Sequence, residues 1–254
     1  HAPVARLLPL LEAAGCSKEI LKLLPKAIKG CKPCGDYAEQ PPRPMIRATM
    51  ARFFNHMCQA DGFVLNGVSY ALVIDECFCY KQAAQLKDHT FDTWFSFFWA
   101  NWFRFFGPMH YLTVDQEGAL AGAECGTLCD KYNISRVLAG SDSAKGVRAA
   151  RHTRTGLAEA HVRLTKSTMR KLAHSAKTEG LEITPEQLAA ETSAAHNALL
   201  TFRGVTPNVG VLGINPREFF EIDNPSPEQP FDTEAAGAAS RAASIRHLAR
   251  ATTL

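Results

Sequence analysis

The sequence predicts an α/β fold in which a mixed five-stranded sheet is flanked by helices. Three closely spaced strand candidates form a meander, a long aromatic segment without strand-like alternation follows them, and strands then alternate with helices. The 254 residues are 46% hydrophobic and 21% charged, which is ordinary for a globular protein with a sizeable core. We therefore expect one α/β core with smaller segments at its two ends.

The meander is expected to contain strands at residues 56–65, 69–74 and 77–82. Asn66-Gly67 between the first two is a strong signal for a two-residue hairpin turn. Residues 91–106 carry aromatic side chains on most sides and predict a buried crossover helix, which Gly107-Pro108 ends. The remaining elements are expected to be strands at 110–114 and 134–138 and helices at 117–132, 155–174 and 185–202.

The two ends of the chain differ from this core in composition. Residues 1–36 predict two short helices followed by Cys31-Lys32-Pro33-Cys34, and residues 37–52 predict a linker rich in proline and charge. The core is expected to span 53–222. Residues 223–254 comprise a proline-rich linker and an Ala/Arg-rich tail, for which one amphipathic helix and disorder are both open.

Composition also bounds the functional class. The net charge of +3 is too small to indicate nucleic-acid binding by itself, and no apolar run reaches the roughly 18 residues of a membrane span. Eight cysteines spread unevenly over this length are unlike a secreted disulfide scaffold. Because the chain starts at His1 without a secretory signal, we expect a fragment of a longer, soluble intracellular protein that does not bind membranes.

Three acidic residues occupy positions suited to a metal-dependent site. Asp61 lies within the first predicted strand, Asp115 ends the fourth, and Glu159 is near the start of a basic helix. Carboxylates so arranged can hold two divalent cations for displacement at phosphorus. Asp75 competes with Asp61, but it ends the second strand, which a meander separates from the fourth, so we prefer Asp61.

The helix that carries Glu159 also carries a stripe of cations. Glu159, Arg163, Lys166 and Arg170 follow i, i+4, i+7, i+11 spacing and share one face. Such a stripe can follow DNA phosphates without base specificity. A solvated face with an ordinary Glu159–Arg163 pair is the alternative. Further cations precede the helix in sequence: Lys145, Arg148, Arg151 and Arg154.

Cysteine and aromatic clusters are better explained by packing than by chemistry. The i, i+4 pair Cys125 and Cys129 is expected to be buried as small hydrophobes, and the same holds for Cys77 and Cys79, which would share one face of a strand. The aromatic residues of the crossover helix are expected in the core rather than on a base-stacking surface: Trp94, Phe95, Phe98, Trp99 and Trp102.

At these carboxylates the chain resembles retroelement integrases, whose catalytic core has the ribonuclease H-like fold. Gln116-Glu117-Gly118 is similar to the turn after the second family Asp, and Gly156 shortly precedes Glu159 as in the family. Gly204-Val205-Thr206-Pro207 and Gly213-Ile214-Asn215-Pro216-Arg217 resemble elements that close retrotransposon integrase cores. The resemblance covers roughly residues 1–220, and the order of these segments carries it more than any one of them.

The resemblance implies an enzyme that processes DNA 3′ ends and transfers them into target DNA. Asp61, Asp115 and Glu159 would bind two Mg²⁺ or Mn²⁺ ions, and the cations Lys145, Arg148, Arg154, Arg163, Lys166 and Arg170 would contact DNA. It also implies a homo-oligomer on DNA, in the nucleus or in a retroelement particle. The interval 159 − 115 = 44 positions is longer than usual in the family, which we attribute to the loop at 140–151.

Integrases of this type also carry a His-His-Cys-Cys zinc module before the core. His1 matches the second His, and Cys31 and Cys34 match the Cys pair, so the first His would lie upstream of this chain. Structural Zn²⁺ needs four such ligands, so the site is incomplete here. Two alternatives to an active integrase stay open: an inactive remnant that binds nucleic acid or supports assembly, and a ribonuclease H-like nuclease.

Overall fold

A five-stranded mixed sheet forms the centre of the computed structural model, which describes residues 4–30, 51–115, 118–139, 156–202, 204–216 and 233–253. The strand order is β3-β2-β1-β4-β5. Strands β1 and β2 are antiparallel, as are β2 and β3, whereas β4 runs parallel to β1 and β5 parallel to β4. The bounds are Met57–Leu65 (β1), Val68–Asp75 (β2), Lys81–Gln85 (β3), Tyr111–Asp115 (β4) and Ser135–Ala139 (β5).

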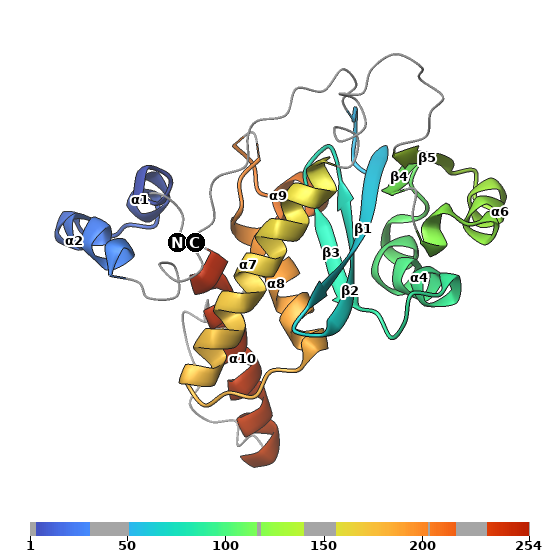
Figure 1. Cartoon of the computed structure of the whole chain (residues 1–254). Coiled ribbons are helices and arrows are strands. Elements are labelled where there is room, and N and C mark those ends of the chain that lie inside the picture. Colours follow the sequence, from blue (N-terminus) through green and yellow to red (C-terminus); the bar gives the residue numbers. More distant parts are fainter. Residues whose placement is uncertain are drawn as a thin grey trace.

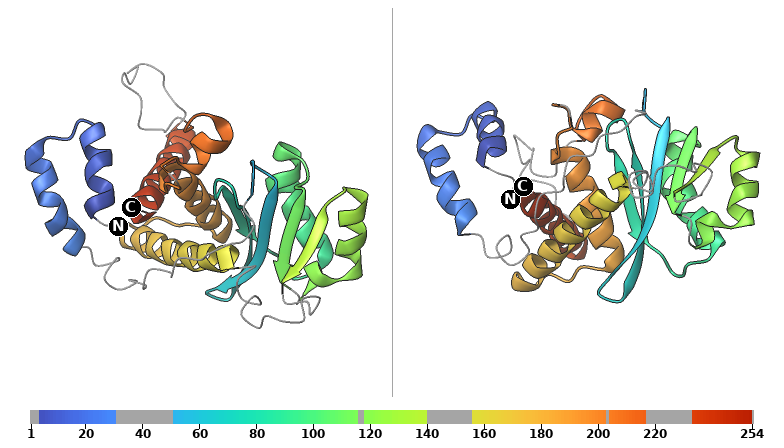
Figure 2. Two further views of the ribbon diagram at one scale, coloured as in Figure 1. Left: turned by 90° about the horizontal axis from the view of Figure 1, so that it is seen from above. Right: turned by 45° about the horizontal axis from the view of Figure 1, so that its top comes forward.

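Helices cover both faces of the sheet (Figure 1; Figure 2). One face packs against α4 and α6, and the other against α7 and α8, with α10 packed on α7 and α8. On the first side lie α4 (Phe91–Phe98), the π-helical η1 (Trp99–Phe103), α5 (Arg104–Phe106), the 3₁₀-helical η2 (Ala119–Ala121) and α6 (Ala123–Lys131). The second side has α7 (Gly156–Thr178), α8 (Pro185–Leu199) and α10 (Thr233–Thr253), and the short α9 (Pro207–Leu212) contacts α8.

The ends of the chain are helical where they are described. Helices α1 (Val4–Ala13) and α2 (Lys18–Lys29) pack on each other, and the predicted cap Ser17 accepts a hydrogen bond from the Ile20 amide. The proposed zinc ligands His1, Cys31 and Cys34 lie outside the described residues. The sequence left a helix and disorder open for the Ala/Arg-rich tail, and the structure has a helix there, α10. None of the described helices is both long and apolar enough to cross a membrane.

The first hairpin forms as the sequence predicts. Asn66 and Gly67 both have positive φ, 52° and 78°, as a type I′ turn requires. This turn fixes the register in which Asp61 pairs with Leu72 across β1 and β2. The predicted order of the five strands along the chain, including the crossover to β4, is confirmed.

The third strand begins later than predicted, at Lys81 rather than at residue 77. The Asp75 carboxylate accepts hydrogen bonds from the amides of Cys77 (2.9 Å) and Phe78 (2.7 Å), which folds the chain into a turn. Cys79 then adopts a left-handed φ of 59°. Cys77 and Cys79 therefore lie in this turn and do not share a strand face, which corrects the expectation from sequence.

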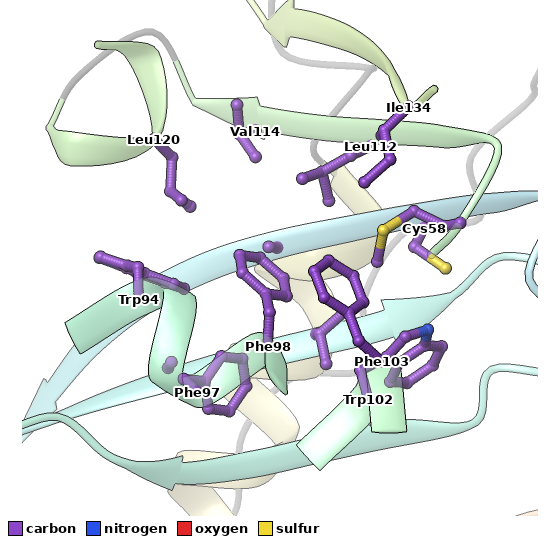
Figure 3. Packing of buried hydrophobic residues seen from close by; sticks show 14 of the residues in the cluster. Cys58, Trp94, Phe97, Phe98, Trp102, Phe103, Leu112, Val114, Leu120 and Ile134 are labelled. Atoms are coloured by element: carbon purple, nitrogen blue, oxygen red, sulfur yellow. The ribbon is translucent and has the colours of Figure 1, made fainter. Parts of the chain in front are cut away.

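The crossover segment is helical over the whole predicted range, with a π-helical turn at η1. Its aromatic side chains fill the core between this helix and β1 and β4, together with Cys58, Leu112 and Val114 (Figure 3). Trp94, Phe98 and Trp102 are buried as expected, but Trp99 is 50% exposed and Phe95 only half-buried. The expected helix at 117–132 is instead η2 followed by α6, in which Cys125 and Cys129 are buried as predicted.

A polar network ties the crossover helix to the sheet. Asn55, held in a left-handed conformation with φ 64°, donates its backbone N–H to the Asp75 carboxylate (2.9 Å). Its side-chain oxygen accepts from Trp102 Nε1 (2.8 Å), and its side-chain nitrogen donates to the Phe106 carbonyl (3.0 Å). Since Trp102 is fully buried, this hydrogen bond satisfies an indole N–H that would otherwise be costly to bury.

Replacing Trp102 with Phe is expected to lower the free energy of unfolding by about 2–3 kcal/mol, because it opens a cavity and leaves the Asn55 oxygen without this donor. Urea unfolding measures the change. The matched control is Trp99→Phe on the same helix: with its side chain half exposed, the expected loss stays within about 0.5 kcal/mol. Equal losses in the two variants would contradict the assigned packing.

Candidate active site

Asp61 and Asp115 lie side by side on neighbouring parallel strands. Ala60 of β1 pairs with Val114 of β4, and the two aspartates follow directly. Ala60 and Val114 belong to the core on the α4 side, so the alternation of side chains places both aspartates on the face toward α7. Neighbouring strands lie about 4.8 Å apart, which brings the two carboxylates close together.

Asp61 and Asp115 line a cavity of about 590 Å³. Asp61 is half-buried and Asp115 exposed. Trp94 and Leu120 on one side of the sheet and Val162 of α7 give the cavity apolar lining. Lys166 of α7 contributes a positive charge. An open, mixed cavity of this kind can admit an extended polar ligand.

The negative charges of this region act on one another. Partial burial raises the pKa of Asp61 above its usual value, and the charges of Asp115 and Glu159 raise it further. The Gly62 amide and the Lys166 ammonium act in the opposite direction. The three carboxylates singled out from the sequence are therefore close enough to be electrostatically coupled.

These residues have the chemistry that Mg²⁺ or Mn²⁺ requires. Both ions prefer carboxylate oxygens, and a divalent cation would stabilise the ionised form of Asp61, whose pKa burial and the neighbouring negative charges raise. Within the described parts of the chain, no three acidic, His or Cys side chains are already gathered closely enough to form a metal site. The chemistry of Asp61 and Asp115 fits a pair of ligands for such an ion.

Glu159 is placed by the first turn of α7, where it is exposed. Helix α7 contacts β1 and β2, and Ala158, Val162 and Met169 bury its inner face. Glu159 lies one residue beyond the buried Ala158, and it is not among the described residues that line the cavity.

Part of the predicted cation stripe lies beside this cavity. Lys166 lines it, with its ammonium 5.8 Å from the centre of the Phe63 ring, while Arg163 is exposed and Arg170 half-buried. These three cations share α7 with Glu159 as predicted. Lys145, Arg148 and Arg154 lie outside the described residues, as does the loop at 140–151.

Asp75, the competing first aspartate, has a different position and environment. It pairs with Cys58, three residues before Asp61 along β1, which is roughly 10 Å away at about 3.3 Å per residue. It is fully buried, and its carboxylate accepts hydrogen bonds from the amides of Asn55, Cys77 and Phe78. Burial raises the pKa of Asp75 to about 6 despite these donors. Asp75 therefore holds the turn after β2 and lies away from the cavity.

The structure adds a residue that we did not single out from the sequence. Gln59 is fully buried on β1, and its Oε1 accepts from the Ala158 amide (2.9 Å) while its Nε2 donates to Glu76 Oε1 (2.6 Å). It shares a strand face with Asp61, two positions away. Gln59 could have been singled out from the sequence because it lies two positions before Asp61 and therefore on the same strand face, where an alternating strand should bury an apolar residue.

A second polar cluster, also missed, lies between α7, β3 and α8. Lys81 is 1% exposed, and its Nζ lies 3.2 Å from His161 Nδ1. Burial lowers the pKa of Lys81 to about 7 and those of His161 and His196 well below the usual value. His196 Nε2 in turn contacts Thr168 Oγ1 at 2.8 Å. These contacts join α7 and α8 to β3.

No protein-family model and no curated protein matches the chain. Among solved structures, it resembles one from a simian T-cell lymphotropic virus intasome in complex with PP2A regulatory subunit B56 gamma, with a TM-score of 0.53 and 18% identity over 89% of this chain and 79% of that one. It is also similar to the HTLV-2 integrase catalytic core domain in complex with magnesium, with a TM-score of 0.47 and 17% identity over 61% and 94%.

The likeness to the intasome chain shows a shared fold. The mixed five-stranded sheet with helices on both faces is the α/β arrangement that the sequence predicted. At this level of identity the likeness does not extend to residues or activity, which depend on the site itself.

Two Asp→Asn substitutions are expected to separate the structural aspartate from the one in the cavity. Asp75→Asn should lower the free energy of unfolding by about 2–3 kcal/mol, because an amide cannot accept all three backbone N–H groups. Asp61→Asn should leave it unchanged or slightly higher, since it removes a repelled charge. Urea unfolding of both variants checks this, and a larger loss for Asp61→Asn would reverse the assignment.

Proposed function

We propose that the chain is the catalytic core of an integrase-type polynucleotidyl transferase that processes DNA 3′ ends and joins them to target DNA. The observation that supports this most is the position of Asp61 and Asp115 directly after the paired residues Ala60 and Val114 of two parallel strands, where their charges and that of Glu159 on α7 act on one another. The integrase-like fold supports the same reading. The intracellular location inferred from composition, in the nucleus or a retroelement particle, belongs to this proposal.

In this proposal the three carboxylates together would hold two Mg²⁺ or Mn²⁺ ions. Asp61 and Asp115 would hold the first ion between β1 and β4, and Glu159 would complete a second with Asp61 or Asp115. When bound, the ions would activate a water or a 3′-hydroxyl and offset charge on the phosphorus. No side chain of the site needs to form a covalent intermediate.

The cations of α7 would hold the DNA backbone beside these carboxylates. Lys166 reaches the cavity and Arg163 lies one turn earlier on the exposed face, so the two could contact successive phosphates. Such contacts position DNA but carry little sequence information. Lys145, Arg148, Arg154 and Arg170 are proposed to extend this surface. Assembly of several copies on DNA is part of the same proposal, in keeping with the intasome that the fold resembles.

Zinc binding by the amino-terminal segment is proposed on sequence grounds alone. His1, Cys31 and Cys34 would provide three ligands of a structural Zn²⁺ site, with a further His supplied from upstream of this chain. The helices α1 and α2 between them are in keeping with a small helical module.

Substituting each carboxylate is expected to abolish activity while the fold persists. Asp61→Asn, Asp115→Asn and Glu159→Gln should each reduce Mn²⁺-dependent strand transfer by at least ~100-fold, because a metal site contributes several kcal/mol to the transition state. The reaction is followed with labelled oligonucleotides and should stop when EDTA is added.

The matched control is Asp130→Asn, a single exposed charge on α6 on the other side of the sheet, which should retain activity. If the parent chain binds DNA but neither cleaves nor joins it, the inactive-remnant alternative holds. If it cleaves RNA in an RNA–DNA hybrid instead, a ribonuclease H-like nuclease is favoured.

Removing the α7 cations is expected to weaken DNA binding in a salt-dependent way. For Arg163→Ala combined with Lys166→Ala, the slope of log K against log salt concentration should become shallower by roughly 2, since each phosphate contact contributes about 0.9. Fluorescence anisotropy with duplex DNA measures it. Arg104→Ala with Lys131→Ala removes two exposed cations from the opposite helical layer, and an equal change there would argue against the α7 surface.

A further inference from the structure

The buried side chain of Gln59 lies between the two halves of the proposed site. On β1 it is two residues before Asp61 and on the same face, so both side chains are directed toward α7. Its partner on α7, Ala158, directly precedes Glu159. One amide thus joins the strand that carries Asp61 to the helical turn that carries Glu159.

The hydrogen bond from Ala158 satisfies a group that the helix cannot satisfy by itself. The first turn of an α-helix has N–H groups without intrahelical acceptors, and Ala158 is the third residue of α7. Gln59 Oε1 accepts this N–H at 2.9 Å in a fully buried position. Breaking a buried contact of this kind is costly, so it resists sliding or rotation of the helix start against β1.

The other end of the Gln59 amide is fixed as well. Nε2 donates to Glu76 Oε1 at 2.6 Å, and the Glu76 backbone N–H donates to the Met57 carbonyl at the start of β1. The carboxylate of Glu76 can only accept, so it selects the amide orientation that presents oxygen to Ala158. A Glu at position 59 would repel Glu76, and a Met would leave the Ala158 N–H buried without an acceptor.

We propose that Gln59 is a positioning residue that sets the distance between Glu159 and the Asp61–Asp115 pair. This inference rests on the proposed function of those carboxylates. Successive residues of an α-helix are rotated by about 100°, so a slip of one residue at the start of α7 would change the direction of the Glu159 side chain by that angle. Fixing the amide next to Glu159 limits such movement and keeps the third carboxylate within reach of a shared cation.

The test compares Gln59→Met with Gln82→Met, a matched control in the same sheet. Gln82 also uses its amide for one side-chain hydrogen bond, to the Tyr80 hydroxyl at 2.9 Å, but on β3 and away from the start of α7. Gln59→Met should raise the Mn²⁺ concentration that half-saturates strand transfer by roughly 10–100-fold, as loss of outer-shell ligand support does. Amide exchange at Ala158 should also become faster, whereas Gln82→Met should change neither.

A double variant then distinguishes positioning of Glu159 from general weakening of the fold. If Gln59 acts through Glu159, adding Gln59→Met to Glu159→Gln should raise the half-saturating Mn²⁺ concentration, measured by direct Mn²⁺ binding, by less than about twofold. Full additivity of the two effects would overturn the inference. The inference would also be overturned if Gln59→Met and Gln82→Met had the same half-saturating Mn²⁺ concentration while that of Glu159→Gln was raised. In that case the proposed function would stand.

If the proposed function is wrong, a different result is expected: Asp61→Asn and Glu159→Gln both keep the parent's Mn²⁺ binding.

Should Gln59→Met not fold, substitutions of Glu76 provide the same test. Glu76→Gln keeps an oxygen acceptor for the Gln59 amide and should match the parent, whereas Glu76→Leu should raise the half-saturating Mn²⁺ concentration. Equal behaviour of these two variants would contradict the positioning role.

Discussion

The parallel pairing of β1 with β4 is the constraint on which the candidate site depends. Hydrogen bonds between these strands fix Ala60 opposite Val114, and the next residue on each strand is an aspartate facing α7. A shift of one residue in this register would turn one aspartate to the aromatic core on the other side of the sheet. The buried crossover helix, with Trp94, Phe98 and Trp102 in that core, holds the register in place.

Placing the carboxylates of Asp61, Asp115 and Glu159 near one another is unfavourable without a cation, and the surrounding structure offsets part of this unfavourable energy. Burial and the charges of Asp115 and Glu159 raise the pKa of Asp61, while Lys166 and a backbone amide offset part of this effect. Asp75 and Gln59 are buried, and their hydrogen bonds hold backbone segments: Asp75 with three amides, and Gln59 with Ala158 and Glu76. Asp61 and Asp115 instead line an open cavity, and this position marks them as functional candidates.

Much of this arrangement could be predicted from the sequence because its signals are local. Asn66-Gly67 fixes a hairpin, and the order of elements gives the crossover to β4 and thus the preference for Asp61 over Asp75. The role of Gln59 depends on its contact with Ala158, which is distant in sequence, and the late start of the third strand depends on the side-chain hydrogen bonds of Asp75 to Cys77 and Phe78. No periodicity encodes those contacts. The π-helical turn that exposes Trp99 likewise has no composition signal.

We propose that Asp61 and Asp115 jointly hold a divalent cation on the α7 side of the sheet. Anomalous diffraction from crystals of the chain soaked in Mn²⁺ can test this, because the ion is located without reference to activity. We expect a Mn²⁺ peak beside the carboxylates of both aspartates, with Glu159 near it or near a second peak. Mn²⁺ bound at Asp75, or absent from the aspartate pair at concentrations that saturate strand transfer, would contradict it.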